Sequence, residues 1–241
     1  ASTRSSMWEQ LGRILRARGR LDGALNAVRE AIRNSRIDPD LHLLLAEILT
    51  DLRKPEQARA EQEKAAAVAR ELLGHPPNTI RTAFDRERDM VGLYAWVAGI
   101  LHRCGHAAEA MATIEEIGRH FAGSANATTA RAGFLISAGK AEAAERLIAE
   151  AIARGEDHSR LHHLHSTVLS QLGRMPRAIA ACRRALEHDP EGPHLHRALA
   201  ALLITDKRWA EAARALETAI ALEPSHAGAQ RQLSNALAAL D

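Results

Sequence analysis

The sequence has few of the residues that build mixed or disulfide-bonded folds. Aromatic residues make up only 3% of its 241 residues, and the only cysteines are Cys104 and Cys182. Two cysteines so far apart form neither a CxxC pair nor a disulfide framework, so we expect two free, buried thiols. No apolar run is long enough to span a membrane, and the first residues contain no signal-peptide core. We therefore expect a cytoplasmic protein without a membrane span.

The sequence also lacks the common catalytic motifs. It contains no Walker loop, no GxGxxG after a strand, no GxSxG and no HExxH. Its carboxylates are scattered, and nothing specifies a nucleophile beside a base. We therefore predict that the chain is not an enzyme and needs no cofactor.

The charge balance excludes another class of partner. The formal net charge of +2 is the difference between 32 basic and 30 acidic residues, which is not typical of a nucleic-acid-binding protein. Basic residues do cluster near the start, at Arg13, Arg16, Arg18 and Arg20. This stretch is either a solvated helix face or a local patch for an anionic partner.

The abundant residues are strong helix formers, chiefly alanine, leucine, arginine and glutamate, which predicts an all-α protein. They recur with a period of 34 residues. The recurring positions include Ala110, Ala144, Ala178 and Ala212; Leu101, Leu135, Leu169 and Leu203; and Gly105, Gly139 and Gly173, with Lys207 in the next slot. Upstream, Ala24 and Ala58 show the same spacing in a phase shifted by 18 residues. One insertion therefore interrupts the array.

Each unit is typical of two amphipathic helices joined by a tight turn. In the unit at 159–192, Gly173 would end the first helix, Pro176 would start the second and Pro190 would end the unit. The segments WEQLGRIL, with Trp8, Leu11 and Gly12, and YAWVAGILHRCG resemble the tetratricopeptide repeat family, in the form found in bacterial proteins.

This resemblance implies an all-α, right-handed α-α superhelix, a single solenoid over residues 1–241. We place six repeats at 5–38, 39–72, 91–124, 125–158, 159–192 and 193–226, and a capping helix at 227–241. The insertion, at 73–90, would lengthen the helices beside it. Its charged part, Arg81 to Asp89, would project as a partner contact, a hinge or a neutral decoration.

The resemblance further implies a concave groove, lined by the first helix of each repeat, that binds a peptide or a helix of a partner protein. The repeat register assigns to this groove Arg13, Arg16, Glu47, Gly99, His102, Gly133, His163, His194, Arg197, Arg231 and Asn235. Gly99 and Gly133 would be explained by a close ligand or by tight helix packing. The end helices are also candidate surfaces for self-association.

Two other functions remain open. The chain could be the recognition arm of a larger sulfotransferase, glycosyltransferase or hydroxylase, or a metal-binding module built on the histidine-rich stretch 158–165. The register places His162 and His165 in the packing between helices, whereas His163 faces the groove near His194. Metal ligands must point at a common centre, so we predict no metal site there. His163 is instead a candidate groove contact whose charge changes near neutral pH.

Overall fold

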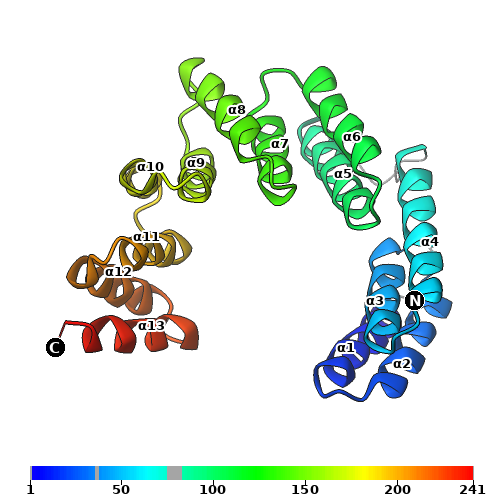
Figure 1. Cartoon of the computed structure of the whole chain (residues 1–241). Coiled ribbons are helices and arrows are strands. Elements are labelled where there is room, and N and C mark those ends of the chain that lie inside the picture. Colours follow the sequence, from blue (N-terminus) through cyan, green and yellow to red (C-terminus); the bar gives the residue numbers. More distant parts are fainter. Residues whose placement is uncertain (1, 36–37, 75–82, 241) are drawn as a thin grey trace. The chain divides into compact units, whose positions relative to one another are not determined.

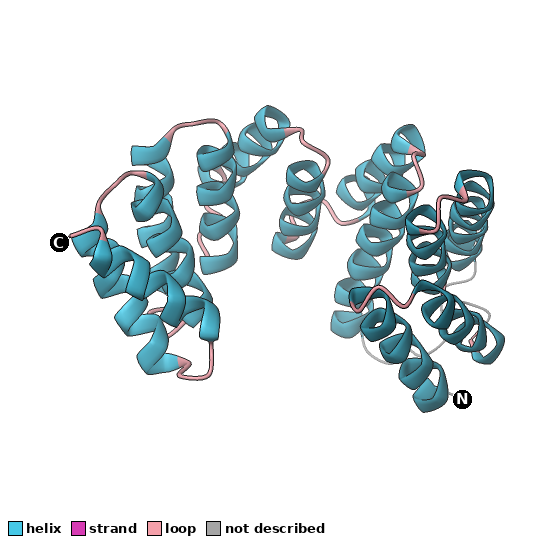
Figure 2. Ribbon diagram, turned by 60° about the horizontal axis from the view of Figure 1, so that its bottom comes forward, coloured by secondary structure: helices cyan, strands magenta, loops and turns pink. Residues whose placement is uncertain are grey.

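The computed structural model describes residues 2–35, 38–74 and 83–240. These residues form thirteen helices joined by short loops and contain no strand (Figures 1 and 2). The all-α prediction is therefore confirmed. The helices group into two compact units, unit 1 (Ala1–Ala122) and unit 2 (Gly123–Asp241).

In each unit the helices follow one another as antiparallel pairs. Unit 1 contains α1 (Ser2–Ala17), α2 (Leu21–Asn34), α3 (Pro39–Asp51), α4 (Pro55–Gly74), α5 (Ala83–Arg103) and α6 (Ala107–His120). Unit 2 contains α7 (Ala125–Ser137), α8 (Ala141–Ala153), α9 (Ser159–Gln171), α10 (Met175–His188), α11 (Pro193–Thr205), α12 (Trp209–Leu222) and α13 (Ala227–Ala238). We call α1, α3, α5, α7, α9, α11 and α13 the first helices, and the others the second helices.

The turn inside a pair follows from one backbone conformation. Gly173 has a φ of 71°. The Arg174 N–H behind it donates to Leu169 O at 2.8 Å, which closes the end of α9. Glycine adopts this conformation without steric cost. Lys207 occupies the same slot one repeat later and has a φ of 59°, so the turn also forms with a side chain present.

The positions that recur every 34 residues form the core. Ala110, Ala144, Ala178 and Ala212 are each fully buried, because a small side chain there lets the two helices of a pair approach closely. The equivalent leucines, Leu101, Leu135, Leu169 and Leu203, are also buried. The period in the sequence is therefore the period of the packing.

The first and last helices each leave apolar residues exposed. On α1 these are Met7, Trp8, Leu11 and Ile14. On α13, Leu233 packs against the core of unit 2, but the expected packing of Leu237 and Leu240 on the same side is wrong, since both are exposed. Ala229 and Ala236 are the buried residues instead. They share a face with Leu233, whereas Leu237 is turned from Ala236 by one residue, about 100°.

The helices on either side of the insertion are the longest in the described chain. α4 has 20 residues and α5 has 21, whereas the others have 12 to 16. Residues 75–82 and the side chains of the charged segment Arg81 to Asp89 lie outside the described part. The placing of the repeats in one continuous solenoid and the role of the insertion stay predictions.

Both thiols are free, as expected. Cys182 is buried and Cys104 is half-buried. Burial raises the pKa of the Cys182 thiol to about 11, so it stays protonated at neutral pH.

Within the described residues, no helix is both long and apolar enough to cross a membrane.

Candidate functional site

In unit 1, charged residues of three first helices meet and neutralise one another. Arg16 of α1 forms ion pairs with Glu47 and Asp51 of α3, and its Nε donates to Asp51 Oδ2 at 2.7 Å. The other Glu47 oxygen accepts from Arg103 Nη2 of α5 at 3.1 Å. The register thus brought Arg16 and Glu47 to one face but gave no sign that they pair.

This network extends to Asp40, at the start of α3. Asp40 accepts from Arg103 Nη1 at 3.1 Å and from Trp96 Nε1 at 2.9 Å. Sequence reasoning missed Asp40, Asp51 and Arg103 as parts of this face, although Asp51 and Arg103 each follow a register position by one residue. Because these pairs are solvent-exposed, each contributes only about 0–1 kcal/mol. They leave this face of unit 1 with little free charge.

Two further predicted residues of unit 1 have local surroundings. Arg13 pairs with Glu9 one turn earlier, at 2.9 Å, so it belongs to a solvated helix face. His102 is half-buried in the last turn of α5. Of the basic cluster near the start, Arg13 and Arg16 are therefore paired with carboxylates.

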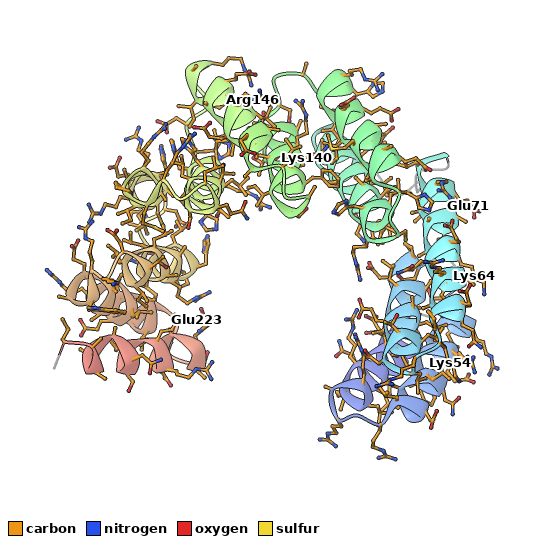
Figure 3. All side chains as sticks on the ribbon, in the orientation of Figure 1. Lys54, Lys64, Glu71, Lys140, Arg146 and Glu223 are labelled. Carbon is orange, nitrogen blue, oxygen red and sulfur yellow. The ribbon has the colours of Figure 1, made fainter. Side chains whose placement is uncertain are left out.

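In unit 2, the register positions of the first helices carry no carboxylate. They are Asn126, Thr129, Gly133 and Ile136 on α7, Arg160, His163, Thr167 and Ser170 on α9, His194, Arg197, Ala201 and Ile204 on α11, and Arg231 and Asn235 on α13. We call this set the unit 2 face. Arg160, Arg231 and Asn235 are exposed, and no ion pair is found for the two arginines in the described part. Arg197 pairs with Glu223, which is labelled at the end of α12 in Figure 3.

His163 and His194 lie next to each other on this face. Their rings meet edge to face with centroids 5.9 Å apart. His163 is half-buried, and its Nδ1 has no hydrogen-bond partner among the described residues. Burial, followed by the charges of His194 and Arg160, lowers the pKa of His163, so its change of charge falls below the range we expected.

The two groove glycines have open space where a side chain would be. A Cβ built on Gly99 or on Gly133 meets no atom within 4 Å, so tight helix packing does not explain them. A Cβ on Gly12 of α1, in contrast, would lie 2.6 Å from Val28 Cγ2 of α2. Gly12 is therefore the helix glycine that packing requires.

We expect this difference to appear in stability measurements. Gly133→Ala should stabilise unit 2 by about 0.5–1 kcal/mol, because alanine favours the helix and meets no obstacle. Gly12→Ala should destabilise unit 1 by about 1–2 kcal/mol, because overpacking outweighs the gain in helix propensity. Urea unfolding monitored by circular dichroism measures both. A loss of stability in Gly133→Ala would show that this position is packed after all.

The histidine-rich stretch separates in three directions. His162 is buried and its Nε2 contacts Asp157 Oδ1 at 2.6 Å. His163 faces His194. His165 is half-buried with an unpaired Nε2, and burial lowers its pKa. The prediction that these three side chains do not converge is confirmed.

That prediction nevertheless missed a convergence with residues outside the stretch. Asp157, in the turn before α9, and His188, the last residue of α10, meet His162 at one end of the α9–α10 pair. An antiparallel pair always places the end of its second helix beside the start of its first. This rule was the available signal, since Asp157 and His162 flank one helix start and His188 ends the next helix.

The chain was compared with models of protein families. A tetratricopeptide repeat model matches residues 9–71, and a second tetratricopeptide repeat model matches residues 135–202, which together are more than half of the chain. The chain belongs to the tetratricopeptide repeat family. Its α-α superhelix fold is that of a scaffold for protein–protein interaction. A comparison with curated proteins found no match.

Solved structures show the same fold. A tetratricopeptide repeat protein from Parabacteroides merdae is 15% identical, with a TM-score of 0.54 over 97% of this chain and 84% of that chain. A structure of the yeast protein Tom70 is 16% identical, with a TM-score of 0.54 over 90% of this chain and 42% of that chain. The Cut9–Hcn1 hetero-tetramer of the APC/C matches with 13% identity and a TM-score of 0.52, over 97% of this chain and 43% of that chain. This repeat array thus spans less than half the length of the last two chains.

Proposed function

We propose that this tetratricopeptide repeat protein binds an extended, acidic peptide or helix of a partner protein along its first helices, with the unit 2 face as the main contact. The observation that carries the proposal is the charge of that face. It bears Arg160, Arg197 and Arg231 and no carboxylate at any register position. A peptide with spaced Asp or Glu residues complements such a surface.

The rest of the unit 2 face suits an extended chain. Thr167, Ser170 and Asn235 offer hydrogen-bonding groups at successive first helices. The open space at Gly133 lets a peptide backbone come close to α7. Arg197 is held by Glu223, so a partner carboxylate would compete with Glu223 for the same guanidinium. Rigid helices already hold these groups in place, so binding requires little ordering.

Unit 1 has a different part in this proposal. Its first-helix charges are used within the network around Glu47, so they are available to a ligand only if these ion pairs open. We therefore assign the electrostatic part of recognition to unit 2. The face of unit 1 would add polar and aromatic contacts, including the exposed ring of Trp96.

A peptide-display selection against the purified chain tests the proposal. Selected peptides should be enriched in Asp and Glu, and Arg231→Glu should weaken their binding at least tenfold, about 1.4 kcal/mol. Arg146 is an exposed arginine of the second helix α8, labelled in Figure 3, so Arg146→Glu makes the same change in charge away from the face. This control should change the affinity less than twofold. Isothermal titration at two salt concentrations should also show weaker binding at high salt.

Two results would contradict the proposal. One is a set of selected peptides with no acidic enrichment. The other is an equal loss of affinity in Arg231→Glu and Arg146→Glu, which would indicate attraction by overall charge and not recognition by the unit 2 face.

A further inference from the structure

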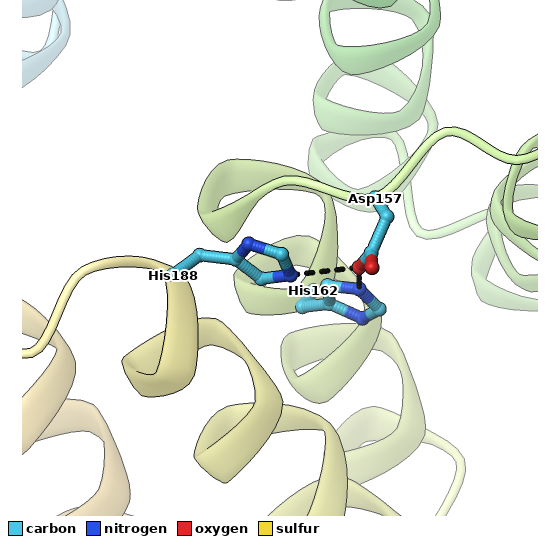
Figure 4. Close-up of side chains that lie close together, drawn as sticks. All are labelled: Asp157, His162 and His188. Carbon is cyan, nitrogen blue, oxygen red and sulfur yellow. Dashed lines mark hydrogen bonds and ion pairs between the residues drawn. The ribbon is translucent and has the colours of Figure 1, made fainter.

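Two histidines and one aspartate of unit 2 direct their ligand atoms at a single point (Figure 4). His162 Nε2 lies 2.6 Å from Asp157 Oδ1, and His188 Nε2 lies 2.7 Å from the same oxygen. The two imidazole rings are stacked, with centroids 5.7 Å apart and planes inclined by only 5°. All three ligand atoms lie within 4.8 Å of one another.

We propose that Asp157, His162 and His188 form a binding site for a divalent transition-metal ion of the Zn²⁺ class. Two imidazole nitrogens and one carboxylate oxygen are a ligand set that Zn²⁺, Co²⁺ and Ni²⁺ accept. The three residues come from the α8–α9 turn, from the first turns of α9 and from the end of α10. The ion would therefore join the two helices of this pair to the preceding turn.

The present distances require only a small adjustment to admit an ion. Zinc lies about 2.0–2.1 Å from its nitrogen and oxygen ligands, so neighbouring ligand atoms in a tetrahedral shell are about 3.3 Å apart. The carboxylate must then move outward by roughly half an ångström. Asp157 can make this movement because it is in a turn and its side chain is 43% exposed. His162 is buried and would provide the fixed side of the site.

The surrounding charges prepare the carboxylate for this role. Arg184 Nη2 donates to Asp157 Oδ2 at 2.7 Å, which leaves Oδ1 for the two histidines or for an ion. The hydrogen bonds from His162, Arg184 and His188 hold the pKa of Asp157 far below its usual range, so it is ionised at any pH at which histidine can bind a metal. The nearby positive charge of Arg184 opposes a cation, so we expect weaker binding than at a closed four-ligand site.

Three protein ligands leave one position of a tetrahedral shell unfilled. Asp157 and His188 are both exposed in part, so water reaches this side of the site. The fourth ligand would be a water molecule. The site is independent of the unit 2 face, since none of its residues is at a register position of that face.

Titration with ZnCl₂ and CoCl₂ on the untagged chain, by calorimetry and by the visible absorption of bound Co²⁺, tests the proposal. We expect one ion per chain with a tetrahedral cobalt spectrum, and a higher thermal midpoint with zinc because the ion binds the folded state. Binding should weaken from pH 7.5 to pH 5.5, since the imidazoles must lose their protons. The variants His188→Gln and Asp157→Asn should each lower the affinity at least tenfold.

The chain has 13 histidines, so a matched control is necessary. His120 is an exposed histidine near the end of α6 in unit 1, and His120→Gln should leave zinc affinity unchanged. Circular dichroism without metal checks that each variant folds. The proposal is overturned if the native chain gives no one-to-one binding, or if His188→Gln and Asp157→Asn, both folded, bind zinc as tightly as His120→Gln. In that case the three side chains form an ion-pair cluster only.

Discussion

Replacing Leu203 by alanine is expected to lower the free energy of unfolding of unit 2 by about 2–5 kcal/mol. Leu203 of α11 is only 1% exposed and belongs to the core cluster that also contains Leu169, Ala212 and Leu216. Its removal takes away the transfer free energy of a buried leucine. It also leaves a cavity that rigid helix pairs fill only in part.

Urea unfolding monitored by circular dichroism measures this loss. The matched control is Leu237→Ala, the same change at an α13 position that is 45% exposed. It should cost less than about 1 kcal/mol, since little apolar surface is buried there. Equal losses in the two variants would contradict the core described for unit 2. A change in the slope of the transition would instead indicate altered cooperativity.

The second large effect is a gain. His165→Leu is expected to stabilise unit 2 by about 1–2 kcal/mol at pH 8, because the unpaired, buried Nε2 is replaced by apolar atoms. The same slot holds Leu11, Leu45 and Leu199 in other repeats, so a leucine side chain is compatible with the helix pair.

This gain should grow as the pH falls. Burial lowers the pKa of His165 in the folded protein, whereas the unfolded chain binds a proton near pH 6.5. Below that pH the unfolded state holds more protons than the folded state, so native stability decreases as the solution becomes more acidic. Leucine has no proton to bind. The advantage of His165→Leu should therefore be larger at pH 5.5 than at pH 8 in the same urea experiment.

His163 supplies a comparison for this pH effect. Its pKa is also lowered by burial, so part of the acid sensitivity of unit 2 remains in His165→Leu. If the difference between native protein and variant is the same at both pH values, then His165 is not held in its neutral form by burial.

The sequence by itself determined the fold class, the family and the repeat core. A 34-residue period in alanine, leucine and glycine is a local property, and each helix pair depends mainly on residues within one period. Positions such as Ala178 and Leu169 were therefore assigned correctly from spacing alone. The same register identified His162 as a packing residue and placed His163 beside His194, because both statements follow from periodicity.

Only the tertiary structure decided which side chains become partners. The register put Arg16 and Glu47 on one face, but their pairing also involves Arg103, which lies far along the chain. Asp157, His162 and His188 come together because an antiparallel helix pair brings three segments to one end, and a repeat register assigns faces but not ends. Leu237 was misjudged for a related reason, since the neighbouring helix decides which side of the last helix is buried.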